Sequence, residues 1–159
     1  MKKITLLAGL LFTGIGFSQS SAEGSATVNA EIVEPISITS SGTLDFGEIA
    51  QDASAGDVTL TATNSVSYTN SNMEVAGTTT TVPTFSVSVP SGLTYAVSIP
   101  DVTLTSGTNN MTLTDFTTSL PASTGASATS FTVGGTLKVG ATQATGSYTG
   151  DVKVTVSYE

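Results

Sequence analysis

The residues that could do acid–base chemistry in this chain are its carboxylates, because the sequence contains no histidine and no cysteine. Two pairs lie close enough in sequence to act together, Asp45 with Glu48 and Glu31 with Glu34, and paired carboxylates are what glycoside hydrolysis needs. The first pair lies beside a turn and the second on the polar face of an extended stretch, where carboxylates are normally solvated. We therefore expect no enzyme, no catalytic residues and no cofactor, with a hydrolase as a remote alternative.

A second chemical candidate is the segment Asp52-Ala-Ser-Ala-Gly-Asp57, which offers oxygen atoms at alternating positions of a loop, as calcium sites do. It lacks the remaining acidic positions and the closing glutamate of an EF-hand loop. A solvated turn accounts for the same residues and is the favoured interpretation, with calcium binding left open.

The first residues have the layout of a secretory signal peptide. Met1-Lys2-Lys3 is positively charged, the run from Ile4 to Phe17 is apolar, and Ser20-Ser21-Ala22 supplies small residues where signal peptidase cuts. The apolar run is too short for a membrane span of ~20 residues. We predict a signal peptide over residues 1–22, with cleavage after Gln19 as the second choice. The expected location is the periplasm or cell surface, with no membrane span after cleavage.

Charge and composition narrow the function classes further. Beyond the signal peptide the chain keeps two lysines against twelve carboxylates, a formal charge of −10. Nucleic-acid binding needs a basic surface, so this class of partner is excluded. Without cysteine the chain can form neither a disulfide nor a thiol-linked lipid anchor. Its fold must therefore be held together by an apolar core.

The stretch from Ser25 to Ile49 suggests how the chain is divided. Ala26, Val28, Ala30 and Ile32 alternate with polar residues, which is the pattern of a half-buried strand. Pro35 interrupts it, because proline donates no backbone hydrogen bond. We predict an N-terminal extension over residues 23–34 and a β domain over residues 35–159.

The β domain shows the same alternation many times, separated by turn residues every 8–15 positions, and no convincing helix. This pattern predicts eight to ten short antiparallel strands in an all-β sandwich with Greek-key connections, and a closed barrel is the alternative. We expect hairpins over residues 84–99 and 102–113, with Val89-Pro90-Ser91-Gly92 as a type I turn in the first. We also expect one strand over residues 131–139, kinked or bulged at Gly134-Gly135, and a final strand over residues 148–158.

Several motifs resemble a known group of proteins. Glu31-Ile-Val-Glu-Pro-Ile-Ser-Ile-Thr39 with Leu44-Asp-Phe-Gly47 resembles the opening of a secreted bacterial domain family of unknown function. That family in turn resembles spore coat protein U and chaperone–usher pilus subunits. The ending, from Gly146 to Tyr158, is similar to the final strand of those subunits. Phe85–Pro90 and Leu93–Pro100 also fit the family of unknown function.

The resemblance implies an immunoglobulin-like sandwich that lacks one strand, which the N-terminal extension of a neighbouring subunit supplies. Ala26, Val28, Ala30 and Ile32 match the inward side chains of such a donor strand. The implied partners are other copies or related subunits, by strand exchange, and a periplasmic chaperone. Many subunits of the spore-coat type carry a disulfide near the first strand, which this chain cannot form.

From these observations we predict a non-enzymatic, secreted structural subunit of a surface fibre or coat, similar to a pilin. Leu44, Phe46 and Tyr148 are the expected structural anchors, the first two in the core and the third at a corner of the sandwich. In the alternative, residues 25–33 pair within their own domain, and the complete domain serves as an adhesin or a glycan-binding module.

Overall fold

The computed structural model describes residues 20–159, in two units that are treated separately, residues 20–32 and Val33–Glu159. Residues 20–32 carry no assigned strand or helix, and the side chains of Val28 and Ile32 are 89% and 98% exposed. Most of the predicted signal peptide, residues 1–19, lies outside the described residues. The described part of the chain contains no helix that is long and apolar enough to cross a membrane.

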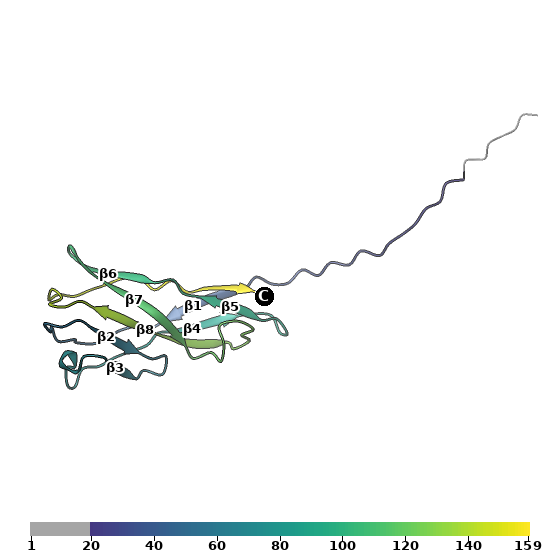
Figure 1. The fold of residues 1–159 in the computed structure, drawn as a ribbon. Coiled ribbons are helices and arrows are strands. Elements are labelled where there is room, and N and C mark those ends of the chain that lie inside the picture. The colour runs from purple at the N-terminus through teal and green to yellow at the C-terminus, as the bar shows by residue number, and fades with distance from the viewer. Residues whose placement is uncertain (1–19) are drawn as a thin grey trace, which may run out of the picture. The chain divides into compact units, whose positions relative to one another are not determined.

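The unit from Val33 to Glu159 is all-β, and its strands pair antiparallel throughout, as predicted (Figure 1). One short 3-10 helix, Ser71–Met73, interrupts the described strands. The strands are β1 (Ser37–Ser41), β2 (Gly56–Leu60), β3 (Val66–Tyr68), β4 (Thr84–Ser88), β5 (Tyr95–Ser98), β6 (Val102–Ser106), β7 (Asn109–Thr118), β8 (Ser130–Val139) and β9 (Thr155–Tyr158).

Strand β8 is the centre of the larger, seven-stranded sheet. It pairs with β7 along most of its length, with β4 through its first residues and with β2 through its last. Strand β1 lies beyond β4, β3 beyond β2 and β6 beyond β7, while β5 and β9 form a second sheet of two strands. Seven of the ten residues of β8 are buried, which fits a strand with neighbours on both edges.

Two clusters of buried side chains form the core. The second cluster lies between the two sheets, where the Phe85 and Phe131 rings stack with centroids 5.6 Å apart and Tyr95 of β5 packs from the other side. The buried members of the first cluster are Phe46, Val58, Leu60, Met73, Leu113, Leu137 and Val139. Strands β2, β7 and β8 supply one side of this first cluster. Its other side is covered by irregular segments, including Leu44, Ile49 and Val152.

The prediction of one continuous strand through Gly134-Gly135 is confirmed, since β8 runs unbroken across both glycines. The bulge lies in the partner strand instead, because β7 shifts register between Thr114 and Thr117. Gly134 is required by close packing, since an added Cβ would lie 2.2 Å from the carbonyl oxygen of Leu60. The glycines thus mark a tight approach of neighbouring backbone rather than the extra residue itself.

Only one of the two predicted hairpins forms. Strands β6 and β7 pair as a hairpin from Val102↔Leu113 to Ser106↔Asn109, as expected. The hairpin over residues 84–99 is wrong, because β4 pairs with β1 and β8 while β5 pairs with β9. A turn is present one residue later than predicted, over residues 90–93, with the amide of Leu93 bonded to the carbonyl of Pro90 at 3.2 Å. This turn carries the chain from one sheet to the other.

The final strand is shorter than its alternating pattern suggests. Only Thr155–Tyr158 is paired as β9, and Thr149 adds a single bridge to Thr105 of β6. The residues between still alternate, with half-buried Val152 and Val154 on one side and exposed Asp151 and Lys153 on the other. The predicted strand over 148–158 is therefore regular only at its end, because no neighbour pairs with residues 150–154 in the described part of the chain.

Candidate functional site

Two irregular segments frame an open groove over the first core cluster. The first edge is residues 42–51, between β1 and β2, and the second edge is residues 143–152, between β8 and β9. Two neighbouring cavities of about 500 and 590 Å³ lie between these edges, and each is lined by residues of both. The irregular segments that cover the first core cluster therefore leave an opening between them, and this opening is the groove.

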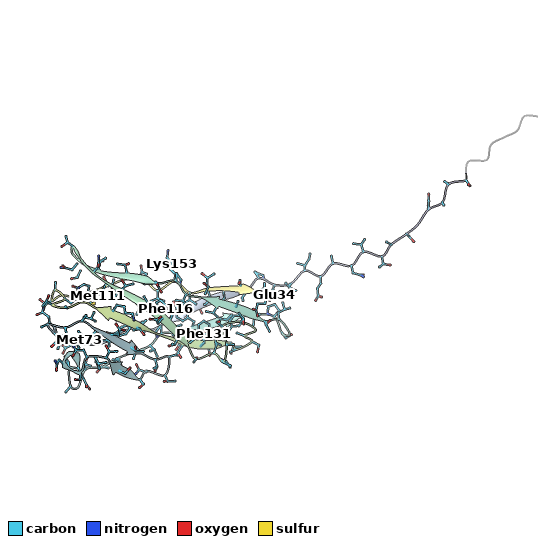
Figure 2. All side chains as sticks on the ribbon, viewed as in Figure 1. Glu34, Met73, Met111, Phe116, Phe131 and Lys153 are labelled. Carbon is cyan, nitrogen blue, oxygen red and sulfur yellow. The ribbon has the colours of Figure 1, made fainter. Side chains whose placement is uncertain are left out.

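The floor of the groove is apolar. Phe85, Leu104 and Leu113 line the first cavity, and Met111, Leu137 and Val139 line the second. Met111 belongs to β7 and is among the residues labelled in Figure 2. Most of these side chains belong to the first core cluster or pack against it. The groove thus opens onto the core through an apolar floor, while polar groups line its edges.

The backbone of each edge is bonded on the side away from the groove. On the first edge, the amide of Asp45 donates to Thr81 and that of Ala50 donates to Met73, both at 2.9 Å. On the second edge, Thr149 exchanges two hydrogen bonds with Thr105. No backbone hydrogen bond joins residues 42–50 to residues 144–152 in the described chain. The facing sides therefore resemble two sheet edges with free donors and acceptors.

The two edges meet at one end of the groove, and the segments that continue them meet beyond the other end. At one end the side-chain amide of Gln51 donates to the carbonyl of Gln143 at 2.8 Å. Beyond the other end the hydroxyl of Tyr158 donates to the carbonyl of Glu34. The edges consequently run antiparallel to each other, so any strand that enters is parallel to one edge and antiparallel to the other.

All three predicted anchors line this groove. Phe46 is 7% exposed and Leu44 is half-buried on the first edge. On the second edge the hydroxyl of Tyr148 donates to the carbonyl of Ala144 at 2.7 Å and accepts from the side-chain amide of Gln143 at 2.8 Å. This hydroxyl holds residues 143–148 in a compact turn, and so fixes the start of the second edge.

Ala26, Val28, Ala30 and Ile32, the predicted donor residues, belong to the separate unit of residues 20–32 and are all exposed. Their alternating apolar side chains are not buried there, which is unusual for residues such as Val28 and Ile32. Among the described residues of its own unit, no other segment covers the apolar floor of the groove. The same is true of the apolar side chains of residues 26–32.

The carboxylate pairs are solvated parts of turns and loops. An oxygen of Asp45 accepts from the amide of Gly47 at 2.8 Å, and the amide of Glu48 donates to the hydroxyl of Thr78 at 2.6 Å. The side chains of Glu31 and Glu34 are exposed. Asp45 and Glu48 both line the second cavity, but none of these four carboxylates is buried.

The two acidic ends of the possible calcium loop have different partners. The carboxylate of Asp52 accepts from the amide of Ser54 and from the side-chain amides of Asn70 and Asn72, at 2.8–3.2 Å. These hydrogen bonds, that of Ser54 above all, hold the pKa of Asp52 below its usual value. Asp57 instead bonds the ammonium group of Lys138 at 2.9 Å. The described residues contain no group of three His, Cys, Asp or Glu side chains that could hold a metal ion.

Gln51 and Gln143, which close one end of the groove, were not identified from the sequence. Both are uncharged polar residues in loops, 92 positions apart, and no pattern links them. Only the fold places the two side by side.

The family model described as "Domain of unknown function (DUF4402)" matches residues 36–158, which include all the strands of the second unit and both edges of the groove. Comparisons with curated proteins and with solved structures found no match.

Proposed function

Since the chain belongs to the domain-of-unknown-function family DUF4402, whose description names no activity, we propose a function from the groove itself. The protein is a non-enzymatic, secreted structural subunit of a cell-surface fibre or coat. It assembles by strand donation, in which residues 25–33 of one copy, the donor segment, occupy the groove of the next copy.

The observation that carries this proposal is a groove with an apolar floor between two antiparallel edges, which no backbone hydrogen bond joins across the groove in the described chain. One added strand would bond to both edges and cover the floor, which is the geometry of recognition by β-strand addition. An exposed sheet edge invites such pairing, and proteins normally cover or blunt it. The edges at residues 42–50 and 144–152 are neither covered nor blunted in the described chain.

The donor segment fits the groove in length and in pattern. Nine residues extended at ~3.3 Å each reach ~30 Å, which is comparable with the ten residues of either edge. Ala26, Val28, Ala30 and Ile32 would face the floor, while the polar Thr27, Asn29 and Glu31 would face solvent. Burying Val28 and Ile32 would stabilise the joint by about 1.5–3 kcal/mol each, besides the backbone hydrogen bonds.

The resemblance to pilus subunits and spore coat protein U agrees with this assignment. In the proposal, a periplasmic chaperone holds the groove until a neighbouring copy or a related subunit arrives. The formal charge of −10 beyond the signal peptide would keep subunits soluble and separate before they assemble.

The test is assembly of the purified protein expressed from the full chain, followed on a denaturing gel with and without heating. We expect a ladder of species that collapses to monomer on boiling. The variant Val28→Ser/Ile32→Ser should lose the ladder, because both inward side chains become polar. The matched control Thr27→Ser/Asn29→Ser changes only outward positions and should keep it. Loss of the ladder in both variants, or a strictly monomeric parent, would overturn the proposal.

A further inference from the structure

We propose that Lys153 receives Glu31 of the incoming donor segment, and that this ion pair sets the register of the joint. The inference rests on the proposed strand donation and adds to it a residue that determines how the strand is aligned. Lys153 follows directly after Asp151 and Val152, the last groove-lining residues of the second edge. It is one of the residues labelled in Figure 2.

Lys153 is the one cation of residues 20–159 that has no carboxylate partner. The other, Lys138, lies 2.9 Å from Asp57 and 3.4 Å from Asp115. Within the described residues no carboxylate lies within 4.0 Å of the ammonium group of Lys153, and its side chain is exposed. A free ammonium group therefore stands beside the groove.

The remaining charges around the groove are negative. Asp45 and Glu48 lie on the first edge and Asp151 on the second, and all three are exposed. Glu31 is the only charged residue of the donor segment, residues 25–33. A carboxylate entering this groove is repelled at the three acidic positions and attracted at Lys153, so charge favours one alignment over its neighbours.

The alternation of the two segments allows the pair to form. Half-buried Val152 and Val154 place Lys153 on the outer face of the second edge. Turning Ala30 and Ile32 toward the floor places Glu31 on the outer face of the donor segment, because the side-chain period is two. Both charged groups then lie on the solvent side of the joint.

Two alignments bring Glu31 beside Lys153, and the cavities distinguish them. With the donor segment parallel to the second edge, residues 26–32 lie beside residues 148–154, which include the lining of the first cavity from Tyr148 to Val152. Val28 then lies beside Gly150 and Ala30 beside Val152, so a large side chain meets a small one at these two positions, while Ile32 lies beside Val154. The antiparallel alignment would place residues 26–32 beside residues 152–158 and leave most of the cavity lining uncovered. The geometry points to the parallel alignment.

Reversing the charges tests the pair. At low salt, Glu31→Lys and Lys153→Glu should each slow assembly about fivefold, because an exposed pair is lost and like charges meet. The double variant Glu31→Lys/Lys153→Glu should recover most of the loss. In about 1 M salt all four proteins should assemble alike, because the screening length falls to ~3 Å. The control Glu23→Lys changes a carboxylate outside the donor segment. Combining it with Lys153→Glu should not restore the assembly rate that Lys153→Glu loses.

Cysteine trapping tests the direction, and the absence of native cysteine gives it a clean background. Oxidising a mixture of the single variants Asn29→Cys and Asp151→Cys should give a disulfide-linked heterodimer. A mixture of Asn29→Cys with Thr155→Cys, the position opposite in the antiparallel alignment, should not. The inference would be overturned if Asn29→Cys formed its disulfide preferentially with Thr155→Cys. It would also be overturned if the double charge-reversed variant assembled as slowly as the sum of the two single effects predicts.

These outcomes are separable from failure of the proposed function. If Val28→Ser/Ile32→Ser abolishes the ladder while the charge-reversed double variant shows no rescue, strand donation stands and the Glu31–Lys153 pair falls. If Val28→Ser/Ile32→Ser leaves the ladder intact, both fall.

Discussion

The side-chain amide of Gln51 donates a 2.8 Å hydrogen bond to the backbone carbonyl of Gln143, and this contact joins the two edges of the groove at one end. Beyond the other end, the hydroxyl of Tyr158 donates to the carbonyl of Glu34 and joins the segments that continue the two edges. Between these two contacts the edges are held apart over an apolar floor. In the proposed function the acceptor site is built into the domain before any strand enters, which would lower the conformational cost of binding one.

Breaking the Gln51–Gln143 contact should loosen the groove more than it destabilises the domain. Gln51→Ala removes one exposed hydrogen bond, so we expect the free energy of unfolding to fall by about 0.5–1.5 kcal/mol. Amide hydrogen exchange should speed up over residues 42–51 and 143–148, while the β8 amides keep their protection. Uniformly faster exchange through β8 would contradict this localised role.

Gly134→Ala should be severely destabilising, because the added Cβ would lie 2.2 Å from the Leu60 carbonyl oxygen and 2.5 Å from the Thr61 carbonyl carbon. Backbone cannot yield as a flexible side chain does, and we expect a loss of about 3 kcal/mol or failure to fold. Gly135→Ala is the matched control. Its Cβ would meet only side-chain atoms of Leu113 and Phe116 at 3.1–3.4 Å. Urea denaturation should rank the two variants in this order, and equal losses would contradict the packing argument.

High pH should unfold the protein through two tyrosines. Burial raises the pKa of both Tyr68 and Tyr95 above the usual value of 10.0, and nearby Glu74 adds to the effect at Tyr68. Above pH 10 the unfolded chain releases these protons while the folded protein retains them, so the free energy of unfolding falls as the pH rises. Tyrosinate absorbance should show two groups that titrate late. Titration of Tyr68 and Tyr95 at or below pH 10 in the folded protein would contradict the assignment.

Calcium should not affect the stability of the domain. The carboxylate of Asp52 is occupied by three N–H donors and that of Asp57 by Lys138, so neither presents free oxygens to a common point. We expect the same Tm with added calcium and with a chelator. Asp52→Ala should lower the Tm in both conditions, because it releases the contacts to Ser54 and Asn70. A calcium-dependent rise in Tm that Asp52→Ala removes would show that a site exists.

The strand content of the domain could be predicted from the sequence because alternation reports directly which side of a strand is buried. Pairing partners could not be predicted in the same way. Pro90 and Gly92 specify a turn, yet the same turn can return a strand to its own sheet or pass it to the other. Here the turn joins β4 of one sheet to β5 of the other. The residues of the turn do not indicate to which sheet the next strand will belong.

The groove was only partly predictable for a related reason. Leu44 and Phe46 were identified because apolar side chains in alternation mark a core, and Tyr148 because a tyrosine near the start of the last strand often caps a corner of a sandwich. The opening between the two edges depends instead on a missing neighbour, and alternation at Val152 and Val154 is the same with or without one. The contacts that close the groove depend on Gln51 and Gln143, whose residue types indicate nothing on their own.

The most direct measurement of strand donation supplies the strand from outside. The full-chain variant Val28→Ser/Ile32→Ser, whose own donor segment is disabled, would be mixed with a synthetic peptide of residues 23–34. We expect the peptide to slow amide hydrogen exchange at residues 42–50 and residues 144–152 together, because one strand bonds to both edges. A peptide carrying serine at positions 28 and 32 should give no protection. Protection of neither edge at peptide excess, or equal protection by both peptides, would contradict assembly by strand donation.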